Sequence, residues 1–143
     1  MSVREFKVEN KLKLEIVTPY GIVFKEDIDE VIAPGSEGEF GVLLGHVPFL
    51  TTLKIGMVTY KMGNEIGYFF INWGYAEVTP EKVLILADSA EKAEDIDIER
   101  AIAAKKRAEE RLKQADNIDH ARALASLERA TARIQIAEKR SAR

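Results

Sequence analysis

The sequence predicts an all-β N-terminal sandwich or flattened barrel of about 8–10 antiparallel strands, followed by a C-terminal antiparallel α-helical hairpin. The first observation behind this prediction is composition, because every glycine, proline and aromatic residue lies at or before Pro80. The second is periodicity, which changes from two residues to three or four near residue 90. We therefore expect two domains, residues 1–90 and residues 91–143.

The N-terminal part alternates apolar and polar residues as half-buried strands do. In KLKLEIV, the residues Leu12, Leu14 and Ile16 fall on one face. Hairpin turns are indicated by MGNE at residues 62–65 and TPEK at residues 79–82. Trp73 is expected to pack across the sandwich. Further strands are predicted at Gly21–Phe24, Glu30–Ala33, Gly56–Lys61, Ile66–Ile71, Tyr75–Val78 and Lys82–Leu86.

The C-terminal part has two apolar stripes with helical spacing, separated by the turn-forming ADNID at residues 115–119. Most positions in both stripes are alanine, which buries little compared with the ~1.5–3 kcal/mol gained by burying Leu or Ile. We therefore predict a shallow helix interface and a hairpin that can detach from the sandwich. The stripes are Ile98, Ala101, Ala104, Ala108, Leu112, Ala115 and then Ala123, Leu127, Ala130, Ile134, Ala137.

Composition excludes several classes of function. The chain has no cysteine and only two histidines, so disulfides and thiolate metal sites are excluded, and a reducing, cytoplasmic compartment is expected. No apolar run approaches the ~20 residues of a membrane span, and the start lacks a signal-peptide core. A net charge of −3 provides no general argument for nucleic-acid binding. The string GSEGEFG lacks the lysine and the following helix of a phosphate loop, so it is interpreted as a turn-rich connection or an interaction surface.

The string IDIERA at Ile96–Ala101 permits two interpretations. In the simpler one, Asp95 or Asp97 caps a helix, and its acids favour the positive helix end. In the other, Arg100 joins Arg129 and Arg133, which share a face of the second helix, and presents guanidinium groups to a phosphate chain. Arginines on helices are more often solvated, so the residues alone favour the first interpretation. A loop histidine such as His46 is expected to be held by a backbone hydrogen bond, with a partner contact as the alternative.

The sequence resembles the epsilon subunit family of the rotary F-type ATP synthase, whose mitochondrial counterpart is called delta. The resemblance covers nearly the whole chain and is carried by PGSEGEFGVLLGHVPFLTTLKIGMV at residues 34–58, YAEVTPEKVLILADSAE at residues 75–91 and DIDIERAIAAKKRAEERL at residues 95–112. It implies a non-catalytic central-stalk subunit, peripheral on the cytoplasmic side of the bacterial inner membrane through its complex. The implied partners are the gamma subunit, the c-ring and the alpha/beta head. By position, Glu39 would face the ring and His46 the gamma subunit.

The family also implies a regulatory role for the hairpin, which lies folded on the sandwich or extends into the head and hinders ATP hydrolysis. Some bacterial members bind ATP through [I/L]-D-x-x-R-A, which Ile96–Ala101 matches at every defined position. No cofactor or metal is required, and ATP is the implied regulatory ligand. The departures from the family pattern are Leu44 for a proline and Trp73-Gly74-Tyr75 for Gly-Gly-Phe. The implied nucleotide contacts are Glu91, Asp97, Arg100, Ala101, Arg129 and Arg133.

Two alternatives belong to other functional classes. A free-standing adaptor or chaperone-like binding module would use the hairpin to hold client chains, and it would associate with varied assemblies instead of one complex. A stand-alone nucleotide hydrolase is disfavoured, because no general base and no phosphate loop is visible in the sequence.

Overall fold

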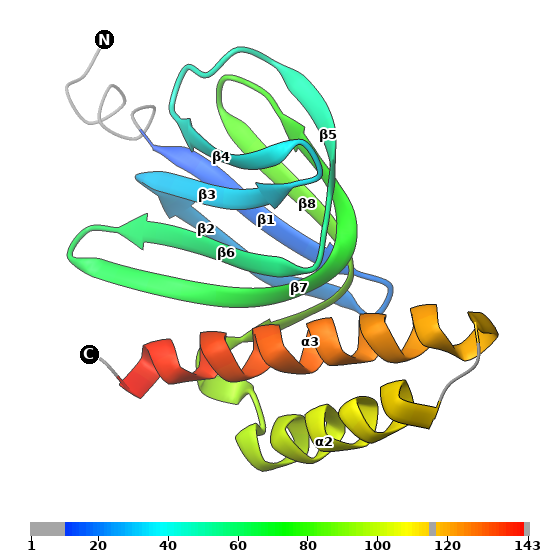
Figure 1. The fold of residues 1–143 in the computed structure, drawn as a ribbon. Helices are drawn as coiled ribbons and strands as arrows, with labels where there is room; N and C mark the ends of the chain where they lie inside the picture. The colour runs from blue at the N-terminus through cyan, green and yellow to red at the C-terminus, as the bar shows by residue number, and fades with distance from the viewer. Residues whose placement is uncertain (1–10, 115–116, 142–143) are drawn as a thin grey trace, which may run out of the picture.

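The computed structural model describes residues 11–114 and 117–141. A β-sandwich precedes two helices that lie together against one side of it (Figure 1). The elements are β1 (Leu12–Thr18), β2 (Gly21–Ile28), β3 (Glu30–Gly35), β4 (Gly38–Leu43), β5 (Phe49–Leu53), β6 (Gly56–Met62), β7 (Glu65–Val78), β8 (Lys82–Lys92), the short 3₁₀ helix η1 (Ala93–Asp95), α2 (Ile98–Gln114) and α3 (Asn117–Ser141).

The eight strands form one hydrogen-bonded sheet that folds over into two layers, with neighbours in the order β2-β1-β8-β7-β5-β3-β4. β6 joins this path through β3 and β7. The long strand β7 pairs with β6 in its first half and with β5 in its second half, so it runs through both layers. Every pairing is antiparallel except that of β1 with β8, which is parallel. The predicted sandwich is confirmed, with this one exception to the expected strand direction.

The predicted strands differ from the observed ones at their ends. β7 is continuous, although two strands had been predicted within it, and β8 runs to Lys92 instead of ending at Leu86. The last four residues of β8 pair with Phe69–Asn72, a partner that the local pattern does not reveal. β4 and β5 were not predicted. Each strand has only one buried residue and β4 contains two glycines, so neither shows a clear alternation of apolar and polar residues.

The main core lies between the layers of the sandwich. Leu12, Leu14 and Ile16 are completely buried in it, as their alternation predicted. Three aromatic rings of this core pack together: Phe24 lies 4.7 Å from Tyr60 and 5.3 Å from Phe69, centroid to centroid. Burial of large side chains at about 1.5–3 kcal/mol each makes the sandwich the stable part of the molecule.

Trp73 is not part of this core, contrary to prediction. Its side chain is 50% exposed, and its backbone has a φ of 54°, a left-handed conformation that is rare outside glycine. Strand pairing is interrupted here, because Asn72 and Gly74 pair with β8 while Trp73 does not. The unusual backbone turns the indole outward.

The two helices form the predicted hairpin, and alanine dominates the contact between them. Ala101 and Ala108 of α2 are buried, as are Ala123, Ala130 and Ala137 of α3. Leu112, Leu127 and Ile134 are half-buried. The predicted turn and the stripe position Ala115 lie largely outside the described residues. The interface is thus built of small side chains, as expected from the sequence.

The hairpin is closed onto the sandwich, and α3 makes most of the contact. A second apolar cluster joins Phe70 of β7 and Ile55 to Ile136 and Ala137 of α3, with Ala93 and Ile96 of the connecting segment between them. α2 reaches this cluster only through Ile98, its first residue. The position of α2 therefore depends on α3.

Candidate functional site

The connection between the domains determines where α2 begins. Asp97 precedes the helix and its Oδ1 accepts a hydrogen bond from the Arg100 backbone N–H at 3.1 Å, while its carbonyl accepts one from Ala101 N–H at 3.1 Å. This is the geometry of an N-cap, which satisfies donors that the first helical turn leaves unpaired. The interpretation of IDIERA as a helix start is confirmed, with Asp97 as the capping residue.

Arg133 of α3 connects the hairpin to the sandwich. Its Nε donates to Glu91 Oε1 of β8 at 2.7 Å, and its guanidinium lies 4.3 Å from the centroid of the Phe70 ring. About a third of each charged side chain is exposed, so the ion pair is partly screened. The contact with the ring adds a cation–π attraction. Arg133 is thereby held in one orientation at the junction of β7, β8 and α3.

A cavity of about 240 Å³ opens beside this ion pair. Its walls come from three elements and the residue before one of them, since Glu91 belongs to β8, Arg133 to α3 and the other lining residues to Asp97 and the first ten residues of α2. The structure brings together five of the six residues named for nucleotide binding. The lining residues are Glu91, Asp97, Arg100, Ala101, Ala104, Arg107 and Arg133.

The sixth residue, Arg129, does not line the cavity. Its Nη2 donates to Ser126 Oγ of the same helix at 3.2 Å. Arg107, by contrast, lines the cavity although sequence reasoning did not name it. Its spacing of seven residues from Arg100 places both on one face of α2, and this is the signal that could have identified it.

The cavity combines three guanidinium groups with two carboxylates. Arg100, Arg107 and Arg133 present guanidinium donors, while Glu91 and Asp97 supply acceptors. Within the described residues, neither Arg100 nor Arg107 makes a carboxylate ion pair. No group of three or more potential metal ligands occurs in this part of the chain either.

The two residues named for docking lie on the other side of the sandwich. Glu39 is exposed on β4, where it pairs with Pro34 across the β3–β4 hairpin. His46 lies in the loop after β4, and its Nδ1 is 2.8 Å from the Val47 carbonyl, with its ring 5.2 Å from that of Phe49. The backbone hydrogen bond expected for this histidine is confirmed. β4 lies away from the helices (Figure 1).

A third region of the surface is apolar. On the outer face of β5, β7 and β8, the side chains of Leu50, Trp73, Tyr75 and Leu86 are all about half exposed or more. Trp73, Tyr75 and Leu86 line one shallow cleft of about 810 Å³. Large apolar side chains grouped on one face are typical of an interaction surface. We name Leu50, Trp73, Tyr75 and Leu86 the apolar face.

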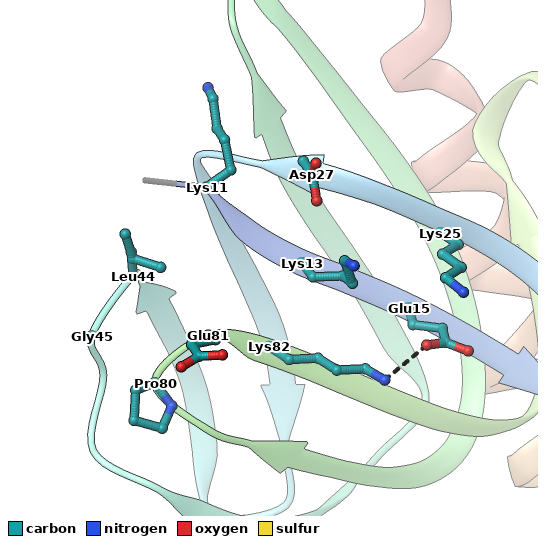
Figure 2. Close-up of a pocket in the computed structure, with 10 residues that line it drawn as sticks. All are labelled: Lys11, Lys13, Glu15, Lys25, Asp27, Leu44, Gly45, Pro80, Glu81 and Lys82. Carbon is teal, nitrogen blue, oxygen red and sulfur yellow. Dashed lines mark ion pairs between the residues drawn. The ribbon is translucent and has the colours of Figure 1, made fainter. Parts of the chain in front are cut away.

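A fourth region is a cleft of about 850 Å³ across β1, β2 and β8, lined by Lys11, Lys13, Lys25 and Lys82 together with three acidic residues (Figure 2). Lys82 Nζ is 2.9 Å from Glu15 Oε2. That hydrogen bond, with the nearby charges of Lys25 and Lys13, lowers the pKa of Glu15. The three carboxylates offset most of the charge of the four lysines, so the charge of this cleft does not indicate what kind of ligand would bind there.

In the described part of the chain, no helix is long and apolar enough to cross a membrane. Together, the fold and its surfaces define a class of protein: a β-sandwich with an exposed apolar face, which carries a closed helical hairpin over an arginine-lined cavity.

Residues 11–93 match the family model described as ATP synthase, Delta/Epsilon chain, beta-sandwich domain, and residues 94–138 match the one described as its long alpha-helix domain. The chain belongs to the ATP synthase delta/epsilon chain family. It is therefore a non-catalytic subunit of an ATP synthase.

Similar curated proteins support this assignment. The chain is 54% identical to the ATP synthase epsilon chain of Thermodesulfovibrio yellowstonii over 107 aligned residues, and these residues make up 75% of this chain and 76% of the relative. It is 56% identical over 104 residues to that of Geotalea daltonii, covering 73% and 75%.

Solved structures share the fold at lower identity. A chain in the Euglena gracilis mitochondrial ATP synthase (OSCP/F1/c-ring) superposes with a TM-score of 0.78 at 21% identity, covering 94% of this chain and 82% of that one. A chain in the Tetrahymena thermophila mitochondrial ATP synthase (central stalk/c-ring) gives 0.58 at 15% identity, covering 93% and 98%.

Proposed function

We propose that this subunit regulates its ATP synthase through the closed hairpin, and that ATP binding in the cavity stabilises the closed form. The observation that carries the proposal is the origin of the cavity walls. β8, α2 and α3 each contribute charged side chains, so this wall set exists only while the hairpin is closed. A ligand held by all three elements binds the closed state in preference to an open one.

The energetics fit such a switch. The contact that holds α3 to the sandwich is a small cluster supported by one partly exposed ion pair. A ligand that binds only the closed state adds RT ln(1 + [L]/Kd), about 2.7 kcal/mol at a hundredfold excess over Kd. That is comparable to the burial of one or two large apolar side chains. ATP would hold the hairpin closed, and ATP depletion would release an extended form that hinders hydrolysis.

We propose further that the sandwich occupies the foot of the central stalk and couples rotation of the membrane ring to ATP synthesis in the catalytic head. The family assignment supports this position, as do the fold neighbours in assemblies described as F1/c-ring and central stalk/c-ring. The exposed Glu39 would contact the c-ring, and His46 and the apolar face would contact the gamma subunit. The chain would then be peripheral, on the cytoplasmic side of the bacterial inner membrane.

Calorimetric titration of the whole chain with ATP tests the ligand part. Wild type should bind ATP at millimolar concentration or below. Arg100→Ala should weaken binding at least tenfold, since it removes a charge-assisted donor. Arg111→Ala is the matched control, because Arg111 is exposed on the same helix and does not line the cavity. Absence of binding heat from wild type would overturn the ATP proposal while leaving the family assignment intact.

Purification of the tagged chain from membranes tests the stalk position. Gamma, the c subunit and the alpha/beta head should be recovered together in fixed stoichiometry. Recovery in varied assemblies without gamma would instead support the adaptor alternative.

A further inference from the structure

We propose that Met57 is a site of reversible oxidation and that its conversion to the sulfoxide releases the hairpin from the sandwich. This goes beyond the proposed function, because it concerns the docking of α3 and requires no nucleotide. The chain has no cysteine, so its three methionines hold all of its sulfur. Of the two methionines among the described residues, Met57 packs at the junction with α3 and Met62 packs against the main core.

The position of Met57 follows from the alternation of side chains along β6. Val58 and Tyr60 belong to the main core, and Met62 packs against it from the same face of the strand. Met57 faces the other way, toward α3, and packs against the second apolar cluster. It lies directly opposite Phe70, a buried member of that cluster, in the β6–β7 pairing. Met57 is therefore part of the contact that holds the hairpin closed.

A second cavity, of about 460 Å³, gives a small oxidant access to this side chain. It lies between β6 and α3, and Met57 is half-buried in its wall. Gln135, Glu138 and Lys139, which also line it, are exposed, so the cavity opens to solvent. A water molecule takes up about 30 Å³, and hydrogen peroxide is only slightly larger, so the cavity has room for it. Peroxide can thus reach Met57 while the hairpin is closed.

Oxidation of the thioether by hydrogen peroxide needs no further reactant. The sulfur attacks one peroxide oxygen, an S–O bond forms and the O–O bond breaks. The proton on the transferred oxygen moves to the departing hydroxide, which leaves as water. Sulfur is oxidised and the peroxide is reduced by the same electron pair. The product is a polar, chiral sulfoxide, which methionine sulfoxide reductases return to the thioether.

The sulfoxide weakens the closed state because of what surrounds it there. In the closed form, Ala132 and Ile136 of α3 lie beside Met57 in the wall of this cavity. A polar oxygen placed against apolar side chains loses water, and this costs free energy unless a hydrogen bond replaces it. When α3 moves away, the oxygen is hydrated again. Because the docking contact is a small cluster, a penalty at one of its members shifts the hairpin toward the open form.

The test compares amide hydrogen exchange of the whole chain before and after treatment with hydrogen peroxide, with mass spectrometry to locate the added oxygen. Exchange in η1 and residues 136–140 should become about tenfold faster, as expected for a poorly satisfied polar group at the contact, while β1 keeps its rate. Incubation with methionine sulfoxide reductases for both sulfoxide epimers should restore the original rates.

Two variants assign the effect to one residue. Met57→Leu conserves the side-chain volume and cannot form a sulfoxide, so its exchange should not respond to peroxide. Met62→Leu is the matched control, since it removes a methionine of the same strand from the opposite face and should respond as wild type does.

Three results would each overturn the inference. If Met57 stays unmodified at a peroxide concentration that oxidises free methionine, the cavity does not admit the oxidant. If Met57 is fully oxidised and exchange is unchanged, the sulfoxide has no effect on docking. If Met57→Leu responds to peroxide as strongly as wild type, the effect belongs to another residue. None of these results bears on ATP binding, which the calorimetric titration tests separately.

Discussion

Replacing Ile136 by alanine should release the hairpin from the sandwich without unfolding either domain. Ile136 is only 2% exposed and lies in the cluster that joins α3 to β7 and Ile55. When the hairpin opens, this side chain passes from a packed environment into water. Alanine is also the better helix former, so α3 itself should persist.

The magnitude follows from the atoms removed. The substitution deletes three carbons worth about 0.8 kcal/mol each, or about 2.4 kcal/mol before any cavity term. Because every 1.4 kcal/mol is a factor of ten, the ratio of closed to open molecules should fall about fiftyfold. A change of this size turns a mostly closed population into a measurable mixture.

Distances between spin labels would detect the release. The chain has no cysteine, so Lys61→Cys on β6 and Glu128→Cys on α3, both at exposed positions, give two unique attachment sites. Double electron–electron resonance should show a single distance in wild type and an added, different component in Ile136→Ala. Ile102→Ala is the matched control, since Ile102 is 53% exposed on α2 and lies outside the cluster.

An unchanged distance distribution in Ile136→Ala would refute the reasoning, because the cluster would then not hold the closed state. An equal response to Ile102→Ala would also contradict it, since the effect would belong to helix content and not to docking.

The structure supports three further predictions. Arg140 Nη1 donates to the carbonyls of Ala93 and Glu94 at 3.3 and 2.5 Å. Arg140→Ala should therefore weaken the contact of α3 with η1 by about 1 kcal/mol, measured as faster amide hydrogen exchange in η1, and exchange as slow as in wild type would contradict this. The hydrogen bond from Lys82 holds the pKa of Glu15 below 4.5, so the ion pair stabilises the fold fully above pH 4.5 and stops doing so as pH falls through the folded-state pKa. Glu15→Gln should therefore flatten the dependence of the unfolding free energy on pH between about pH 3 and 6, measured by urea unfolding. An unchanged dependence would argue against a stabilising Glu15–Lys82 pair. Trp73→Gly should change the melting temperature by only a few degrees, because glycine readily adopts the positive φ of this position. It should weaken binding to the gamma subunit at least tenfold, measured by surface plasmon resonance, and undiminished binding would exclude a role of the apolar face in that contact.

Some residues of the cavity are placed by their neighbours in the chain, and others only by the packing of the helices. The cap of α2 depends on residues within one helical turn, so the sequence narrows it to Asp95 or Asp97, and the structure assigns it to Asp97. The positions of Arg129 and Arg133 depend on the rotation of α3 against its neighbours. Both lie on one face of the helix, yet only Arg133 meets Glu91, because Phe70 and Ile136 set how α3 lies on the sheet.

Strand pairing shows the same division. Alternation in β1 predicts which residues are buried, since side chains on successive residues point to opposite faces of a strand. Alternation does not predict the parallel pairing of β1 with β8, which joins segments about 70 residues apart. The alternating pattern of either strand would fit several other strands equally well.

From the sequence alone follow the two domains, the inward face of β1, the alanine stripes, the helix cap and, through resemblance, the family. The tertiary structure alone decides the closed state, the outward Trp73 and the union of Glu91, Arg107 and Arg133 around one cavity. The physical reason is range: caps and periodicity depend on neighbours in the chain, whereas a site between three elements depends on how their apolar faces pack against one another.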